Sequence, residues 1–205
     1  MKNNLNQIMG DIYLMIRRSI ERLRGIDFID SVDIDEIGID KTIGNRYDIS
    51  NIRALRQILK QCEITSQDVF VDFGCGKGAV LALAAEYSFH KVIGVEISKK
   101  LVDIAINNLN RLRVNKAEIV CKDAREYKDI DEITYFYFFN PFPECVFRIV
   151  MKNIKESYLK NKRKIVIIYY NPVCEQIIID TDIFVKKQEI HMKNVCAQIS
   201  IYNNI

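Results

Sequence analysis

Between residues 69 and 170 the chain alternates short apolar runs with stretches of helical period, and this alternation narrows the possible folds more than any other feature. The apolar runs are rich in β-branched and aromatic residues and predict strands at 69–73, 91–96, 117–121, 133–139 and 164–170. Helices are predicted between them, from a glycine cluster to about 87, at 99–112 and at 144–159. Strands that are apolar almost throughout are typical of a parallel sheet covered by helices on both faces.

The C-terminal part of the chain departs from this alternation. Residues 183–190 and 195–202 are two further strand candidates with no helix between them, only Met192-Lys-Asn194. They predict an antiparallel pair. The expected architecture is therefore a doubly wound, mostly parallel sheet that ends in an antiparallel hairpin.

The N-terminal part has a different pattern. Residues 5–24 place apolar side chains at helical spacing opposite four arginines, and Gly25 is a natural stop. The stretch 27–40 is acidic and has no Lys or Arg, and a second helix is predicted from Ser50, as its N-cap, to about Cys62. We expect an N-terminal helical extension or lid at 1–46 and one main domain at 47–205.

The composition fits a folded protein that needs no cross-links. A chain of 205 residues with 49% hydrophobic residues can bury a core without disulfides or metals. Its six cysteines are scattered and it has two histidines, so no metal site is expected. No apolar run has the length of a spanning helix, and the first residues lack the features of a signal peptide. We expect a cytoplasmic monomer or homodimer with no membrane partner; the net charge of +3 neither requires nor excludes nucleic acid.

The segment Val71–Gly78 is the strongest local signal for a ligand site. Its three glycines alternate where a strand is followed by a helix, so the backbone can pass close to a ligand and the helix N-terminus presents free N–H groups. A tight turn without a ligand would also use glycines. The spacing matches neither a phosphate-binding P-loop nor the dinucleotide pattern Gly-x-Gly-x-x-Gly, which disfavours a nicotinamide dehydrogenase.

Two acidic residues at the ends of the next two strands fit a nucleoside. Glu96 closes the second strand, 22 residues after Gly74, where a carboxylate can accept hydrogen bonds from both ribose hydroxyls. Asp123 follows the third strand, where it can accept from an adenine amino group. Together with the glycine turn, these acids predict nucleoside binding at the carboxyl ends of the first three strands.

Four segments in this order resemble the successive motifs of class I S-adenosylmethionine-dependent methyltransferases: Asp72-x-Gly74-x-Gly76-x-Gly78, Gly94-Val-Glu96-Ile97-Ser98, Cys121-Lys-Asp123-Ala124 and Phe139-Asn140-Pro141-Phe142. The resemblance covers about residues 47–202 and implies an α/β fold: a doubly wound, mostly parallel seven-stranded sheet with an antiparallel C-terminal hairpin and helices on both faces. It also implies S-adenosyl-L-methionine as cofactor, with the glycine turn against its methionine part, Glu96 on the ribose and Asp123 at the adenine. The cofactor-binding residues that it implies are Tyr47, Asp72, Phe73, Gly74, Gly76, Gly78, Glu96, Ile97, Asp123, Ala124 and Asn140.

Tyr47 enters this set through a looser similarity. The segment 44–50 is similar to a Tyr-x-Pro-Ser/Thr segment of small seven-strand protein-lysine methyltransferases, with Ile49 in place of the proline. In that family the segment covers the methionine carboxylate, which makes Tyr47 a candidate cofactor lid. The alternative is a core tyrosine followed by a helix cap at Ser50.

The residues Asn140, Pro141 and Phe142 are the candidates for catalysis. In methyltransferases that act on planar amino groups, an Asn-Pro-Pro-aromatic motif in this place orients the amino group and stacks on the substrate. This chain has one proline, and its Phe142 comes one place early. Two interpretations stay open: the segment orients an amino group, or it only closes the cofactor pocket.

The expected function is transfer of a methyl group to a nitrogen, with a protein side chain or small molecule slightly favoured over nucleic acid as the acceptor. No histidine lies in a motif and the well-placed acids are assigned to the cofactor, so an acceptor that needs a strong base is disfavoured. The alternatives are a non-catalytic S-adenosylmethionine-binding sensor or interaction module, and a methyltransferase for an RNA or DNA base amino group.

Overall fold

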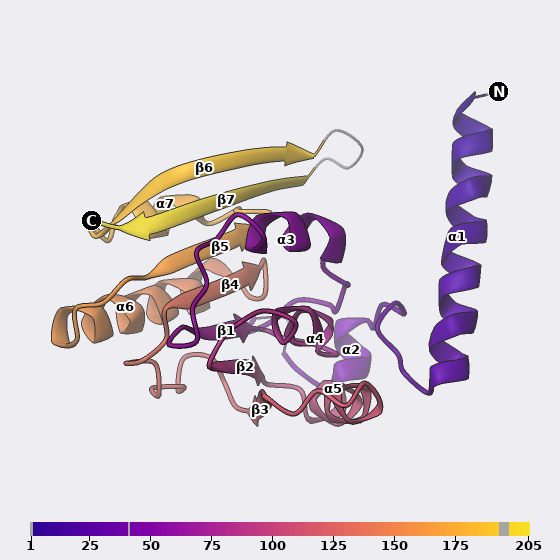
Figure 1. Cartoon of the computed structure of the whole chain (residues 1–205), viewed down its shortest axis with the longest axis horizontal. Helices are drawn as coiled ribbons and strands as arrows, with labels where there is room; N and C mark the ends of the chain where they lie inside the picture. Colours follow the sequence, from indigo (N-terminus) through magenta and orange to yellow (C-terminus); the bar gives the residue numbers. More distant parts are fainter. Residues whose placement is uncertain (1, 41, 193–196) are drawn as a thin grey trace.

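The computed structural model describes residues 2–40, 42–192 and 197–205 and contains a seven-stranded sheet (Figure 1). The strand order is β3-β2-β1-β4-β5-β7-β6. The strands are β1 Val69–Phe73, β2 Lys91–Glu96, β3 Ala117–Cys121, β4 Tyr135–Phe139, β5 Val166–Tyr170, β6 Phe184–Met192 and β7 Ala197–Asn204. The first five strands are parallel, and β7 lies antiparallel between β5 and β6. The predicted fold class, including the inserted antiparallel strand, is confirmed.

Helices cover both faces of the sheet, as predicted. The helices in the described residues are α1 Lys2–Arg24, α2 Ile34–Ile37, α3 Ile52–Leu59, α4 Ala79–Ala84, α5 Lys99–Arg111, α6 Glu144–Lys160 and α7 Glu175–Ile179. Apolar side chains of α3, α4 and α5 form one core cluster with one face of the strands, and those of α6 and α7 form a second cluster with the other face. Since helices cover the parallel strands on both faces of the sheet, almost every strand residue in its centre is buried.

The aromatic run on β4 illustrates this double burial. Tyr135 and Tyr137 belong to the cluster under α3 and α4, whereas Phe136 and Phe138 belong to the cluster under α6. Alternate side chains of a strand point to opposite faces, so four consecutive aromatic residues are shared between the two cores. Their burial confirms that this run is core rather than a base-stacking surface.

Several element boundaries differ from the prediction. Helix α3 begins at Ile52 with Asn51 as its N-cap, because the Asn51 side chain accepts a hydrogen bond from the Ala54 N–H; Ser50 is not the cap. Helix α4 ends at Ala84, earlier than predicted, and the short helices α2 and α7 were not anticipated. The predicted hairpin connection at 192–194 lies partly outside the described residues.

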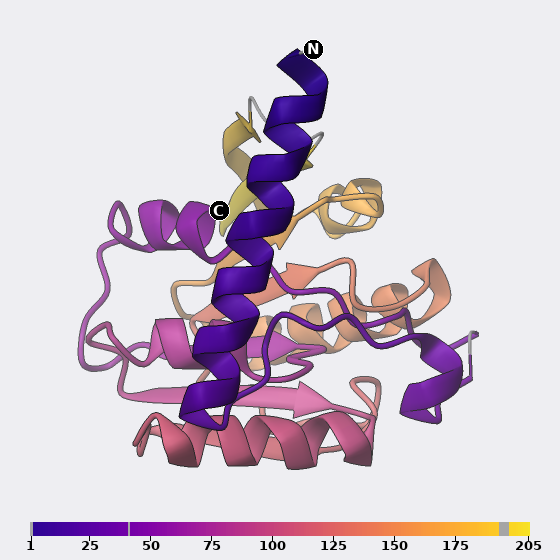
Figure 2. The same ribbon diagram turned by 90° about the vertical axis from the view of Figure 1, so that its right-hand side faces the viewer.

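Helix α1 presents its apolar stripe to solvent. In Figure 1 it lies beside the body of the protein and is joined to it near its C-terminal end. The stripe residues are between 45% and 88% exposed: Ile12, Met15, Ile16, Ile20 and Leu23. Glu21 on the opposite side is buried, so the helix contacts the body through its polar face. Figure 2, which looks at the molecule from this side, shows α1 in front of the rest of the chain. Among the described residues no helix is long and apolar enough to cross a bilayer.

Candidate functional site

A cavity of about 380 Å³ opens at the carboxyl ends of β1 to β4. The order of the strands reverses here, because β1 lies between β2 and β4. In open α/β sheets, this switch point is where ligands bind. The volume lies within the range of about 300–1,000 Å³ that is usual for small-molecule sites.

Most of the residues singled out in the sequence meet in the wall of this cavity. They are Tyr47, Asp72, Gly74, Gly76, Glu96, Ile97, Asp123, Ala124, Asn140, Pro141 and Phe142. Phe73 and Gly78 are not in the wall. The Phe73 ring stacks on Phe136 and Phe138 in the core, since neighbouring strand residues point to opposite faces. Gly78 is the N-cap of α4, in a left-handed conformation with φ 83°.

Gly74 and Gly76 are required by the packing of the protein itself. A Cβ on Gly74 would lie 2.5 Å from the Cβ of Pro141, and one on Gly76 would lie 2.3 Å from the Tyr47 ring. Both glycines also have positive φ, which side chains disfavour. The two glycines therefore let the turn after β4 and the segment before α3 come together over the end of β1.

Two carboxyl groups from neighbouring strands face the cavity. Glu96 accepts hydrogen bonds from the backbone N–H groups of Gly76 (3.0 Å) and Ser98 (2.9 Å), which fix its orientation. Burial raises the pKa of Glu96, and these N–H groups partly offset the rise. Burial, with a smaller contribution from Glu96, raises the pKa of Asp72 well above its usual range. Asp72 makes no hydrogen bond among the described residues, so its oxygens are available to a ligand.

Asp123 is held in place by its neighbour Arg125. The Arg125 guanidinium donates to both carboxylate oxygens, at 2.6–3.1 Å, and the Arg125 backbone N–H donates at 2.8 Å. This arginine lowers the pKa of Asp123 and keeps the carboxylate charged. The sequence prediction assigned Asp123 to the adenine without foreseeing that Arg125 already occupies both oxygens.

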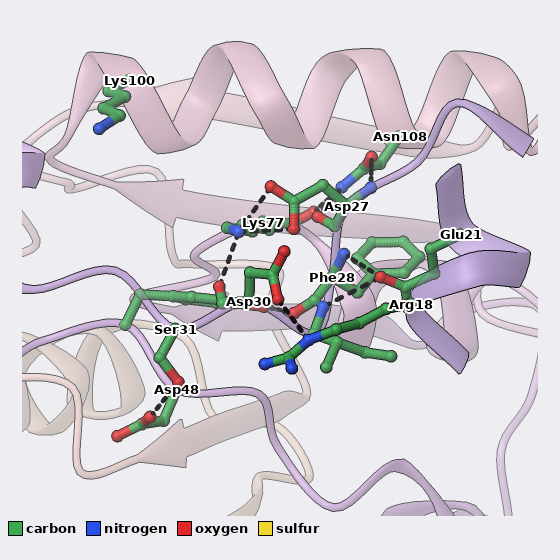
Figure 3. Close-up of polar contacts among 12 residues, drawn as sticks. Arg18, Glu21, Asp27, Phe28, Asp30, Ser31, Asp48, Lys77, Lys100 and Asn108 are labelled. Atoms are coloured by element: carbon green, nitrogen blue, oxygen red, sulfur yellow. Dashed lines mark hydrogen bonds and ion pairs between the residues drawn. The ribbon is translucent and has the colours of Figure 1, made fainter. Parts of the chain in front are cut away.

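The acidic N-terminal segment is fastened to the glycine turn by Lys77 (Figure 3). The Lys77 ammonium donates to both oxygens of Asp27 and to the main-chain oxygen of Asp30, each at 2.7 Å. It also lies 5.2 Å from the centre of the Tyr47 ring. Although the lysine side chain is 1% exposed, Asp27 compensates its charge.

Three further contacts hold this segment against the body, and Figure 3 shows those of Glu21 and Asn108. Glu21 accepts hydrogen bonds from the N–H groups of Phe28 and Ile29, and Asn108 both accepts from and donates to the Asp27 backbone. The Tyr47 hydroxyl donates to the Phe28 carbonyl at 2.7 Å. The N-terminal segment thus positions Tyr47, which in turn covers Gly76 at the cavity.

The turn after β4, which also lines the cavity, has unusual backbone geometry. Asn140 has φ 40°, and its carbonyl accepts a hydrogen bond of 2.8 Å from the Asn45 side chain. Phe142 is buried, with its ring centre 6.4 Å from Phe138 and 6.1 Å from Phe147. Its ring therefore packs against two aromatic rings of the core, although Phe142 also lines the cavity.

The cavity wall also contains residues outside the predicted cofactor-binding and catalytic sets. They are Ile39, Ile43, Gly44, Asn45, Arg46, Asp48, Ser50, Cys75, Ala79, Val80, Val95, Leu101, Lys122, Phe139, Val146 and Asn171. Most belong to segments flanking the predicted motifs, so proximity along the chain could have indicated them. Asn171 had a more specific signal, since Asn171-Pro172 repeats the pair Asn140-Pro141 at the end of the next parallel strand.

Comparisons by sequence point to methyltransferases. Residues 44–129 match the family model described as "Histone methylation protein DOT1". A protein-lysine N-methyltransferase of Saccharolobus islandicus is 28% identical over 83 residues, which is 40% of this chain and 52% of that protein. The chain therefore matches about half the length of this relative.

Comparisons by structure identify the fold. An RNA methyltransferase of Salinibacter ruber, solved with S-adenosyl-L-homocysteine, has a TM-score of 0.58 at 14% identity, over 76% of this chain and 92% of that one. A SAM-dependent methyltransferase of Aquifex aeolicus has a TM-score of 0.59 at 13% identity, over 78% and 100%. An rRNA methylase of Streptococcus thermophilus has a TM-score of 0.55 at 12% identity, over 76% and 97%.

The chain has the fold of the class I S-adenosylmethionine-dependent methyltransferases. This confirms the resemblance carried by the glycine turn and the motifs after the next three strands. The family model extends from the Tyr47 segment past Asp123, so it includes most of the predicted cofactor-binding residues.

Proposed function

We propose that this chain is a methyltransferase that binds S-adenosyl-L-methionine in the cavity and transfers its methyl group to a nitrogen, with a protein lysine as the first candidate acceptor. The observation that carries the proposal is the meeting of eleven motif residues from five separate segments in one cavity wall. A tight glycine turn without a ligand would not require Glu96, Asp123 and Asn140 to face the same space.

The chemistry of the cavity fits this cofactor. Asp72 is a buried carboxyl without a hydrogen-bond partner among the described residues, and such a group is costly unless a ligand compensates it. S-adenosyl-L-methionine carries a positive ammonium and a positive sulfonium, either of which would do so. Glu96 would hold the ribose hydroxyls with the lone pairs that its two backbone donors leave free, and Asp123, Ala124 and Ile97 would surround the adenine.

The bound cofactor supplies a methyl group on a positively charged sulfur, which is already activated for displacement. The chain itself has to align the acceptor nitrogen with that methyl group and exclude water, and alignment alone can contribute about 7–11 kcal/mol. We assign the cover to Tyr47, which packs against Gly76 and is held in place by the segment 26–32. The turn Asn140–Phe142 forms the acceptor end.

The geometry favours an aliphatic amine over a nucleic-acid base as acceptor. A nucleic-acid base in a protein site commonly stacks on an aromatic face. Phe142, the only aromatic residue of the turn, is buried against Phe138 and Phe147. The similarity to a protein-lysine N-methyltransferase supports this preference. The RNA methylases are 12–14% identical to this chain and are evidence for the fold alone.

A transfer assay tests the proposal. The protein is incubated with methyl-labelled S-adenosylmethionine and, in parallel, with poly-L-lysine, a protein extract or total RNA. We expect label in poly-L-lysine or protein and not in RNA, with loss of transfer in Glu96→Ala. Asp103→Asn, an exposed change on α5, is the matched control. Label in RNA alone would reverse the choice of acceptor, and no label in any acceptor would contradict the enzyme proposal.

A second candidate is a non-catalytic module that binds the cofactor and docks a partner. The exposed apolar stripe of α1 favours it, because contiguous apolar surface on a protein commonly marks an interaction site. The two candidates differ in the transfer assay. A docking module would bind the cofactor normally and transfer no methyl group to any of the acceptors.

A further inference from the structure

Two asparagine-proline pairs follow the carboxyl ends of two neighbouring strands in the middle of the sheet. Strands β4 and β5 are parallel neighbours whose last register pair is Phe139 with Tyr170. The next residue on each strand is an asparagine followed by proline: Asn140-Pro141 and Asn171-Pro172. Neighbouring strands lie about 4.8 Å apart, so the two asparagines leave the sheet at adjacent positions. Both line the cavity.

Both asparagines have the same uncommon backbone conformation. Asn140 has φ 40° and Asn171 has φ 53°. Within the described ranges four non-glycine residues have positive φ, and these are two of them. The backbone around each is held by hydrogen bonds: Asn45 donates to the Asn140 carbonyl, and the Asn171 N–H donates to the Gln198 carbonyl at 2.7 Å. Strained backbone that is fixed from outside is typical of sites where a side chain is aimed at a ligand.

The side-chain amides themselves are unengaged. In the described part of the chain neither the Asn140 nor the Asn171 carboxamide makes a hydrogen bond. Asparagines whose only task is to form a turn commonly bond their own backbone two residues on. Here two carbonyl oxygens and two NH₂ groups remain available at one end of the cavity.

We propose that Asn171 is a second acceptor-binding residue and that its side-chain oxygen, with that of Asn140, receives the two N–H hydrogens of a neutral primary alkylamine of the lysine type. The proposal rests on the proposed methyltransferase function and extends it to the recognition of the acceptor. With both hydrogens held, the nitrogen lone pair points away from the two amides, as a displacement on a cofactor bound in the same cavity requires.

The surroundings suit an amine that is neutral when it reacts. Asp48 in the cavity wall is paired with Arg46 at 2.7 Å, so the charge of its carboxylate is compensated. Lys122 adds another cation to the wall. The other acids of the wall are Asp123, which Arg125 pairs, Glu96, which two backbone N–H groups hold, and Asp72, which the positive groups of the bound cofactor would compensate. With these carboxyl groups engaged, two uncharged amides do not stabilise an ammonium, which favours loss of its proton. Ile39, Ile43 and Val146 offer apolar surface for an aliphatic stem.

The transfer step balances with these groups. The nitrogen lone pair forms the new C–N bond while the S–C bond breaks, and its electron pair stays on sulfur, which becomes a neutral thioether. The methylated nitrogen is then positively charged and returns to neutrality by releasing a proton to water. The two asparagine oxygens hold the amine throughout and exchange no proton.

Nuclear magnetic resonance of asparagine side chains tests the assignment without requiring turnover. The full chain is labelled with ¹⁵N-asparagine, saturated with S-adenosyl-L-homocysteine and titrated with n-butylamine at pH about 9.5, where roughly a tenth of an alkylamine is neutral. Signals are assigned from Asn140→Gly and Asn171→Gly, since glycine accepts the positive φ. We expect both amide signals to shift with one dissociation constant, and trimethylamine, which has no N–H, to shift neither.

Two variants separate recognition from a structural role. Asn171→Gly should weaken n-butylamine about tenfold while S-adenosyl-L-homocysteine binds as in the wild type. Asn171→Asp keeps an oxygen and tolerates the same backbone, but its carboxylate should bind the ammonium form and so shift the optimum for amine binding toward neutral pH. The exposed change Asn115→Gly is the matched control and should alter nothing.

The outcomes distinguish a failure of the proposed methyltransferase function from a failure of the acceptor-binding role of Asn171. If S-adenosyl-L-homocysteine does not bind, the proposed function fails and the acceptor site fails with it. If it binds but n-butylamine moves only the Asn140 signal, or neither signal, the role of Asn171 is overturned while the cofactor site stands. Shifts with adenosine or cytidine 5′-monophosphate and not with n-butylamine would overturn the alkylamine and assign the pair to a base amino group.

Discussion

Asp72 and Glu96 place two acidic groups in the wall of the cavity. Both are buried, and burial raises the pKa of each. Glu96 is compensated by backbone N–H groups, whereas Asp72 has no donor among the described residues. The protein therefore keeps a costly group at Asp72, and a cationic ligand would offset the cost.

The first prediction concerns this carboxyl. Because its folded-state pKa is raised, the native chain holds the proton to higher pH than the unfolded chain. Its contribution to stability is therefore complete below the ordinary aspartate pKa of about 3.9 and is lost as pH rises through the raised value. Asp72→Asn should melt at a higher temperature than the wild type near neutral pH, and the gap should close in acid. Thermal unfolding over pH measures this; equal melting temperatures at every pH would contradict it.

The second prediction concerns the contact between Gly76 and Tyr47. Gly76→Ala places a methyl group in the Tyr47 ring and strains a residue with φ 53°, so it should cost about 2–4 kcal/mol. Tyr47→Ala removes the ring that is in the way. The double variant should therefore be less destabilised than the sum of the two single variants. Denaturant unfolding of the three variants decides; strict additivity would show that the ring and the glycine do not meet.

At the scale of elements, helix α1 is amphipathic, but its apolar side is not the side that is buried. Its apolar stripe was predicted correctly as a pattern, but the helix is attached through Glu21 and Arg18 on the other side. The Arg18 guanidinium donates to Asp30 at 2.7 Å, in an exposed pair of small energetic value. The buried Glu21 carboxylate, with two backbone donors, is the stronger attachment.

The third prediction follows from this attachment. Leu23→Gln and Ile16→Gln should change the free energy of unfolding by no more than about 0.5 kcal/mol, since both side chains face solvent. Glu21→Ala should cost about 1–3 kcal/mol, because it leaves the Phe28 and Ile29 N–H groups without their acceptor. Glu21→Gln keeps an acceptor oxygen and should recover part of the loss. Urea unfolding measures each change; a large loss in Leu23→Gln would place the stripe in a core.

At the scale of the molecule, the alternation of strands and helices was sufficient to predict the sheet and its antiparallel end. The positions of Glu96 and Asp123 at strand ends also followed, because parallel strands bring their carboxyl ends to one edge. Contacts that join distant segments could not be predicted. Nothing local in the sequence pairs Lys77 with Asp27, or Asn45 with Asn140, since these pairs are 50 and 95 residues apart. Phe73 was assigned to the site although the strand alternation turns it into the core.

The fourth prediction concerns the N-terminal 46 residues, of which we expect only the part after residue 18 to contribute strongly to stability. A chain that begins at Ser19 keeps Glu21 and the segment 26–32 on the glycine turn, and it should melt close to the full chain. A chain that begins at Gly44 leaves Lys77 without Asp27 and Tyr47 without its acceptor on Phe28, so it should melt at a much lower temperature. Thermal unfolding compares the two. Equal melting temperatures would show that the segment is a separable appendage.

The central claim is that this cavity binds S-adenosyl-L-methionine, and calorimetric titration tests it most directly. The account predicts saturable one-to-one binding of S-adenosylmethionine and S-adenosylhomocysteine to the wild type and to Asp103→Asn, with loss of binding in Glu96→Ala. It also predicts that S-adenosylmethionine affinity rises with pH, because the cationic ligand binds best when Asp72 is ionised. Absence of binding by both ligands, or unchanged binding in Glu96→Ala, would contradict the claim.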